Sequence, residues 1–405
     1  MQNQIIEILD RIVLSTKNKI LTQKDNNYLG GLYSGEYSIL LFLYCYADYF
    51  SDTNIWDMSN QYLEKLLQRI KFSIATSAYL CDGLSGILYL ILLLKEKRFV
   101  DVDLTDVEAN LDEYLYCQMI SEIKEDNYEL LYGGVGIGMY FIKKGKSQYF
   151  NIIIDELYRM REKHHFTDKL EATYSKNKLG NDISFAHGMS GIIPLLTHIY
   201  KHNNCPKSKE LIISLVNSVI SQKIKYEEYG AYFPSSENCN KNNHQIQKSR
   251  LSWCNGDLGI ANSLKLAGNA LNDNTLIELS YKIYFDSMTR LDLSSNYIED
   301  ACFCHGSSGA YHFFNKMYKE SNIIDYRNAA DYWLKKTLNY SCYKDGIGGY
   351  KTVIGDKLIN DYSLLTGTAG IGLVLLSYLS DNIDILNEIF LFDNFVVDGL
   401  PKMKY

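Results

Sequence analysis

A glycine pair that recurs along the chain constrains the fold more than any other feature of this sequence. Copies of a Gly-x-x-Gly pattern, usually followed by an aliphatic residue, begin 48 to 68 residues apart over nearly all of the 405 residues. Repetition at such periods is typical of folds built from similar stacked units. The paired positions are Gly35/Ser38, Gly83/Gly86, Gly133/Gly136, Gly188/Gly191, Gly256/Gly259, Gly306/Gly309 and Gly367/Gly370, with serine replacing glycine only in the first copy.

The segments around the glycines have helical character. An apolar run of helical length follows each copy, as in "GILYLILLLKEK" from Gly86 and "GIIPLLTHIYKH" from Gly191. Further helix-like stretches lie between the copies, such as residues 275–288, in which apolar side chains roughly follow a 3.6-residue period. Each unit is therefore predicted to contain a helix, a loop and a second helix that begins at the glycines.

Seven such helical hairpins predict an all-α fold. Glycine allows close backbone approach, and the free N–H groups at a helix start face whatever lies ahead of it. We expect an α/α toroid with all the glycine turns at one end around a central cavity, and an open helical solenoid is the competing arrangement. With only four prolines and no linker-like stretch, residues 1–405 are predicted to form a single domain. The seventh unit ends near residue 380 and leaves a short tail.

Residues just before the first glycine of each pair would line the common cavity of such a ring. Cys254, Cys304, His305 and His187 all occupy this place in their units. Two thiolates and an imidazole suit tetrahedral Zn²⁺ with one position open, which is an arrangement typical of catalytic zinc. The cysteines are too far apart in sequence for a local zinc finger, so the predicted central site depends on the repeat geometry. Cys302 is an alternative ligand.

Each candidate also has a plain structural interpretation. A single free cysteine is usually a small buried side chain, so the shared repeat position carries the argument for a metal site. His187 is a candidate acid or base, although a lone histidine is more often a hydrogen-bonded core residue. Arg250 could fix a carboxylate or an oxyanion, or could simply tie its loop to a helix end. Glu129 could orient His187 or be a solvated carboxylate.

Charge and composition exclude several classes of protein. A net charge of −7 without a basic stripe is unlike that of a nucleic-acid-binding protein. The N-terminus lacks the pattern of a signal peptide, and the most apolar run, residues 86–94, is too short to span a bilayer. Nine cysteines without a regular framework indicate reduced thiols. We therefore expect a cytoplasmic protein without a transmembrane segment.

Four segments together resemble the lanthionine synthetase C-like family, and the resemblance extends over all seven repeats. They are "SFAHGMSGI", "SRLSWCNGDLGIA", "CHGSSG" and "LLTGTAGIGLVLL". The resemblance implies a toroid of seven inner and seven outer helices with a zinc ion in the central cavity. It places the zinc ligands on Cys254, Cys304 and His305, the catalytic histidine on His187 and the family's arginine on Arg250.

Two positions depart from the family pattern. Glu129 stands where the family usually has aspartate, which keeps the charge and adds one methylene. Asn255 follows the first zinc cysteine where the family usually has tyrosine, so a phenol is missing here. With these departures the chain could be a cyclase whose catalytic groups are adjusted differently, or a relative of reduced activity.

The resemblance implies a zinc-dependent peptide cyclase of lantibiotic biosynthesis. Such an enzyme adds cysteine thiolates to dehydroalanine or dehydrobutyrine and forms (methyl)lanthionine thioether rings in a ribosomal precursor peptide. The expected partners are the dehydrated precursor, a dehydratase and an exporter, and any membrane association would be made through partners.

Two other functions remain open from the sequence. One is a zinc-dependent protein of the same family that binds or adds a thiol such as glutathione without forming rings. The other is a glycosidase on a helical toroid, which needs two carboxylates facing a cleft. The positions before the glycines supply only Asp82, which disfavours the glycosidase.

Overall fold

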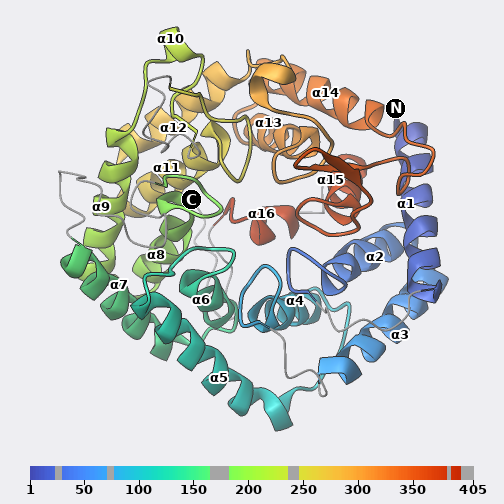
Figure 1. The fold of residues 1–405 in the computed structure, drawn as a ribbon, viewed down its shortest axis with the longest axis horizontal. Coiled ribbons are helices and arrows are strands. Elements are labelled where there is room, and N and C mark those ends of the chain that lie inside the picture. Colours follow the sequence, from blue (N-terminus) through green and yellow to red (C-terminus); the bar gives the residue numbers. More distant parts are fainter. Residues whose placement is uncertain (23–29, 71–76, 165–181, 236–245, 381–384, 394–405) are drawn as a thin grey trace.

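Two concentric rings of helices make up the structure (Figure 1). The computed structural model describes residues 1–22, 30–70, 77–164, 182–235, 246–380 and 385–393. Within these residues the inner ring consists of α2 (Tyr37–Phe50), α4 (Leu84–Glu96), α6 (Gly134–Lys143), α8 (Met189–Asn203), α11 (Asp257–Leu271), α13 (Ser307–Ser321) and α15 (Thr368–Leu379). The outer ring consists of α1 (Gln2–Thr22), α3 (Thr53–Ile70), α5 (Thr105–Lys124), α7 (Phe150–His164), α9 (Pro206–Ser221), α12 (Asn274–Ser287) and α14 (Ile324–Asn339).

The ring closes between the last unit and the first. α15 packs against α2, and α1 packs on the outside of α15 (Figure 1). The remaining short elements within the described residues are α10 (Tyr226–Tyr229), α16 (Ile385–Ile389), two 3₁₀ turns and a hairpin of strands β1 (Thr352–Ile354) and β2 (Lys357–Ile359). The prediction of an all-α toroid is therefore confirmed, and the open solenoid is excluded.

A short contact within each turn explains the second glycine of the repeat. A Cβ atom added at Gly259 would lie 2.1 Å from the carbonyl oxygen of Trp253, and one at Gly309 would lie 2.0 Å from that of Phe303. The other second glycines approach the carbonyl six residues earlier just as closely. The turn folds back over the first turn of the inner helix, so the glycine is needed by its own turn and not by a neighbouring helix.

Backbone hydrogen bonds join successive turns around the ring. In most cases an amide two or three residues before the first glycine donates to the carbonyl at the equivalent place in the next turn. These bonds are Cys81 N to Leu131 O, Tyr33 N to Cys81 O, Leu365 N to Tyr33 O, Cys304 N to Leu365 O, Trp253 N to Cys304 O and Phe185 N to Cys254 O, with lengths of 2.8–3.1 Å. The ring of hydrogen bonds holds the residues before the glycines in one layer at one end of the toroid.

The chain after the seventh unit folds into the centre of the ring. α16 lies inside the circle of inner helices (Figure 1). Phe390, Leu391 and Phe392, which follow α16, are fully buried. The described part of the predicted tail is therefore a component of the core.

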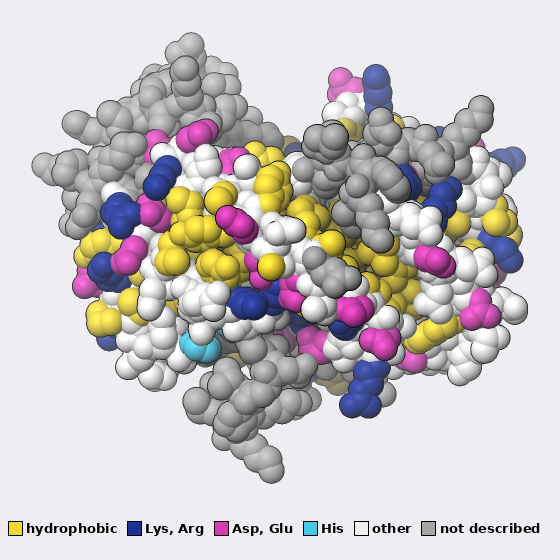
Figure 2. Space-filling model, turned by 90° about the horizontal axis from the view of Figure 1, so that it is seen from below, with side chains coloured by type: hydrophobic (Ala, Val, Ile, Leu, Met, Phe, Trp, Pro, Cys, Tyr) yellow, Lys and Arg dark blue, Asp and Glu magenta, His cyan; other side chains and the backbone are white. Residues whose placement is uncertain are grey.

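The outer surface is mixed in character. Figure 2, drawn from the side on which α3 and α5 lie, shows apolar side chains among acidic and basic ones. Val107 and Tyr114 on α5 are among the exposed large apolar residues. Among the described helices, none is both long and apolar enough to cross a membrane.

Candidate metal centre

Two neighbouring turns bring two thiols and one imidazole together. Cys254 lies in the turn before α11, and Cys304 and His305 lie in the turn before α13. The amides of Trp253 and Cys254 both donate to the carbonyl of Cys304, at 3.1 and 3.4 Å, and this aligns the two turns. As a result the ligand atoms of Cys254, Cys304 and His305 all lie within 4.8 Å of one another.

The chemistry of the three donors fits zinc. The pKa of Cys254 lies well below its ordinary value because Cys304 and then His305 donate hydrogen bonds that stabilise its thiolate. The neighbouring sulfur atoms of Cys302 and Cys254 raise the pKa of His305, and the hydrogen bond to Cys254 together with burial raises the pKa of Cys304 well above its ordinary value. Zinc binding to this set would therefore release protons, as is usual for thiol and imidazole ligands.

A second group of donors shares His305. Asp300 and Cys302 each bring a ligand atom within 4.8 Å of that ring and of each other. The carboxylate of Asp300 is already used, because Oδ1 accepts from the amide of Cys302 and Oδ2 from the amide of Val353, both at 2.9 Å. Burial raises the pKa of the Cys302 thiol to about 11. The pKa of Cys304 is raised as well, so the difference between the two groups is Asp300: because both of its oxygens already accept backbone hydrogen bonds, the Cys254, Cys304 and His305 group is the better metal site.

The candidate acid–base residue lies in the same layer of turns. His187 precedes α8, and its Nδ1 atom is hydrogen-bonded to Oε2 of Glu129, which belongs to the preceding unit. The other carboxylate oxygen of Glu129 accepts from the amide of Tyr132 at 3.0 Å. The hydrogen bond that the ring donates to the carboxylate of Glu129 raises the pKa of His187. The side chain of His187 is half exposed, so this imidazole is open to a substrate.

Tyr132 adds an aromatic wall beside His187. The two rings are nearly parallel, with an interplanar angle of 8° and centroids 6.3 Å apart. The hydroxyl of Tyr132 accepts a hydrogen bond from the thiol of Cys81 at 3.3 Å. Tyr132 occupies the position before Gly133, where the repeat predicts residues that line the common cavity.

Arg250 is placed differently from the other predicted residues. Its guanidinium lies over the ring of Tyr297, 5.7 Å from the centroid. None of the contacts within the described chain joins this side chain to His187 or to the three metal donors. Its backbone carbonyl accepts from the amide of Asp257 at 3.3 Å, which fixes the loop that leads to Cys254.

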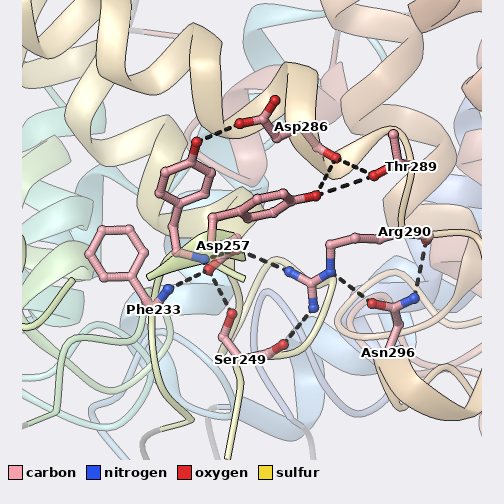
Figure 3. Close-up of polar contacts among 9 residues, drawn as sticks. Phe233, Ser249, Asp257, Asp286, Thr289, Arg290 and Asn296 are labelled. Atoms are coloured by element: carbon pink, nitrogen blue, oxygen red, sulfur yellow. Dashed lines mark hydrogen bonds and ion pairs between the residues drawn. The ribbon is translucent and has the colours of Figure 1, made fainter. Parts of the chain in front are cut away.

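A buried polar network supports the loop before Cys254 (Figure 3). Asp257, the first residue of α11, forms an ion pair with Arg290 at 3.0 Å and accepts hydrogen bonds from Ser249 Oγ and from the amides of Tyr232 and Phe233. Burial raises the pKa of Asp257 although Arg290 and these hydrogen bonds oppose the shift.

The guanidinium of Arg290 extends this network to the loop backbone. It also binds the carbonyl of Ser249 at 2.6 Å and Asn296 at 2.8 Å (Figure 3). The sequence gives little sign of this network. Among its members only Asp257 has a fixed place in the glycine repeat, directly after Gly256.

Comparisons with known proteins agree with the fold of the ring. The family model of lanthionine synthetase C-like proteins matches residues 28–391. Among solved structures, nisin cyclase matches with a TM-score of 0.72 and 18% sequence identity, over 95% of this chain and 96% of that chain. At this identity the likeness shows a common fold. No curated protein sequence matches the chain.

Proposed function

Because the chain belongs to the lanthionine synthetase C-like family, we propose that it is a zinc-dependent cyclase that forms thioether rings in a dehydrated ribosomal peptide. The observation that carries the proposal is the convergence of Cys254, Cys304 and His305 in the same layer of turns as the His187–Glu129 pair. Metal donors and an oriented imidazole on one rim would supply the activated thiol and the proton donor that accelerate the addition of a thiol to a dehydroamino acid.

The metal would be held by the three donors that the ring brings together. Zinc held by these three donors would leave room for a substrate thiol and would lower the pKa of that thiol, so that it could react as a thiolate at neutral pH. The negative charge of the two protein thiolates would leave the incoming sulfur electron-rich. Cys304 is buried, whereas Cys254 and His305 are partly exposed, so a substrate thiol could approach the site from their side.

The protein groups beside the metal site would complete the addition. When the substrate thiolate attacks the β-carbon of dehydroalanine, a carbon–sulfur bond forms and an enolate is left at the α-carbon. His187 would protonate this carbon, so the proton lost by the thiol is balanced by one gained at carbon. Glu129 favours the protonated ring and fixes its orientation.

The proposal also assigns roles to Arg250 and to two partner proteins. Arg250 would bind a carbonyl of the peptide or the enolate oxygen after leaving the ring of Tyr297. A dehydratase would supply the substrate, and an exporter would remove the finished peptide. Asn255 offers no phenol for proton transfer, which leaves that task to His187.

Ring formation can be tested with the zinc-loaded protein and a synthetic peptide that contains one dehydroalanine and one cysteine. Cyclisation leaves the peptide mass unchanged, so it is measured as the loss of thiols that react with iodoacetamide. We expect Cys304→Ser to lose zinc and activity, and Cys342→Ser, at an exposed cysteine, to keep both. His187→Gln should keep zinc and react about 10²- to 10⁴-fold more slowly.

The same reaction run with added glutathione separates the two functions of this family. Preferential transfer of glutathione to the dehydroalanine, with the peptide cysteine left free, would favour the thiol-addition protein. A zinc-free Cys304→Ser variant that cyclises at the normal rate would contradict the proposed mechanism.

A further inference from the structure

Residues 385–393, which we name the C-terminal strap, contact both turns that carry the candidate metal ligands. The indole of Trp253 donates to the carbonyl of Phe390 at 3.0 Å, and the two rings meet edge to face with centroids 5.4 Å apart. On the other side, Phe390 stacks on Phe303 with centroids 3.6 Å apart and an interplanar angle of 13°. Trp253 and Phe303 are the residues directly before Cys254 and Cys304.

The strap also binds the two helices that begin at these turns. The side-chain amide of Asn262 on α11 donates to the carbonyl of Leu391 at 2.8 Å. On α13, Nε2 of His312 is hydrogen-bonded to Oδ1 of Asn387 at 3.1 Å, and Lys316 pairs with Asp393 at 2.8 Å. The strap therefore connects the Cys254 unit to the Cys304 unit at the level of the turns and along the helices.

Two other units hold the strap from across the ring. The hydroxyl of Tyr33, in the first turn, donates to the carbonyl of Ile389. The ammonium of Lys143 on α6 is almost fully buried and is paired with both Glu388 and Glu96. A buried cation with two carboxylates is costly to separate, so the strap is fixed in place independently of the ligand turns.

We propose that the C-terminal strap positions Cys254 and Cys304 for metal binding, with Phe390 as its central positioning residue. The inference rests on the proposed zinc site and adds the part of the chain that determines its geometry. Replacing a side chain that contacts and orients metal ligands without binding the metal typically weakens metal affinity by about 10- to 100-fold. The ring of Phe390 touches the neighbours of both cysteines at once, so its replacement loosens both ligands, although the hydrogen bond from Trp253 to the Phe390 carbonyl remains.

The test compares zinc affinity and folding stability in full-length variants. Phe390→Leu removes the stacking on Phe303 and the edge contact with Trp253. Phe141→Leu is the matched control, because Phe141 is equally buried but lies on α6, where it packs on Tyr149 with centroids 4.2 Å apart. Asn387→Ala is a milder variant that removes only the contact with His312 and changes little core volume.

Zinc affinity is measured by chelator competition, and the melting temperature of each zinc-free variant is recorded. Phe390→Leu should weaken zinc binding at least about 10-fold relative to Phe141→Leu at a comparable loss of stability, and should alter the sulfur-to-metal absorption of the cobalt-substituted protein. Asn387→Ala should weaken binding by a smaller factor.

Equal zinc affinities for Phe390→Leu, Asn387→Ala and Phe141→Leu would overturn the proposal. If Phe390→Leu fails to fold, Asn387→Ala alone decides the matter. The measurement does not depend on ring formation. If zinc binding depends on the strap as predicted but the protein never cyclises a peptide, only the proposed function is refuted.

Discussion

At the scale of single residues, the site depends on how each side chain is held by the turn of a neighbouring unit. Glu129 comes from the third unit and His187 from the fourth, yet they form one hydrogen-bonded pair. Glutamate reaches this partner although the family usually has aspartate there. The pair explains why the pKa of His187 is raised and gives the imidazole a fixed orientation.

Replacing Glu129 should move the pH dependence of the reaction. An acid must be protonated to donate, so the rate of ring formation falls as pH rises through the pKa of His187. Glu129→Gln removes the hydrogen bond to the carboxylate, which is the main cause of the raised pKa, and the fall should then occur at lower pH. A pH–rate profile of zinc-loaded protein measures the shift, and an unchanged profile would exclude His187 as the acid.

The same pair makes a pH-dependent contribution to stability. Because folding raises the pKa of His187, the contribution to the free energy of unfolding is complete below the ordinary value of 6.5 and is lost as pH rises through the raised value. Urea titrations of the wild-type protein and Glu129→Gln should therefore differ more at pH 6 than at pH 9. An equal difference in the free energy of unfolding at pH 6 and pH 9 would mean that the stability contributed by the pair does not depend on the protonation of His187.

At the scale of elements, the glycine turn determines where each inner helix begins and what its preceding residues can contact. The sequence was sufficient to predict the seven turns and the helices after them, because the pattern repeats with every unit. For the second glycine the sequence predicted a close backbone approach but not the atom that is approached. In the structure this atom is the carbonyl oxygen six residues earlier in the same turn. A backbone contact of this kind leaves no pattern beyond the glycine itself.

Gly309→Ala should disturb the turn that carries Cys304 and His305. The added Cβ atom would lie 2.0 Å from the carbonyl oxygen of Phe303, so the backbone must shift. We expect the substitution to lower the free energy of unfolding by an amount near the upper end of the range of roughly 1–3 kcal/mol, and to weaken zinc binding.

Gly138→Ala is the matched control for this substitution, because the atoms nearest its Cβ would not be backbone atoms but the movable side-chain ends of Leu195, Ile153 and Met119, at 3.1, 3.3 and 3.6 Å. Chemical denaturation and chelator competition compare the two variants. Equal effects would show that the turn has room for a side chain.

The buried pair of Arg290 and Asp257 should be far more important to stability than a surface pair. Arg290→Met leaves the carboxylate of Asp257 buried without its cation, and should lower the free energy of unfolding by about 3–5 kcal/mol. Arg327→Met removes the exposed pair with Asp331 on α14 and should cost about 0.5 kcal/mol or less. Denaturant titration of both variants measures the difference, and similar losses would contradict a supporting role for the network in Figure 3.

This network could not have been predicted from the sequence. Arg290 lies in the loop after α12 and reaches Asp257 and Ser249 across the fold, without any repeat position of its own. Arg250, by contrast, was selected from its place before Trp253 and Cys254, and the structure holds it over Tyr297. Loop contacts of this kind depend on tertiary packing, which a periodic pattern does not encode.

At the scale of the whole molecule, closure of the ring converts distant sequence positions into one layer. The contact of α15 with α2 joins the two ends of the repeat, and the backbone bonds between turns bring Cys254 beside Cys304. The repeat predicted a ring or a solenoid, and only the structure distinguishes between them. The C-terminal strap was missed because its nine residues, six of them apolar, lie outside the glycine repeat and no pattern shows where they pack.

X-ray absorption at the zinc edge of the purified full-length protein tests the central claim most directly, because it identifies the atoms bound to the metal. Ring closure around a zinc site predicts one zinc ion per chain with two sulfur ligands and one imidazole nitrogen from the protein, and loss of the zinc from Cys254→Ala as from Cys304→Ser. A protein that binds no zinc, or a zinc ion without sulfur ligands, would contradict the account.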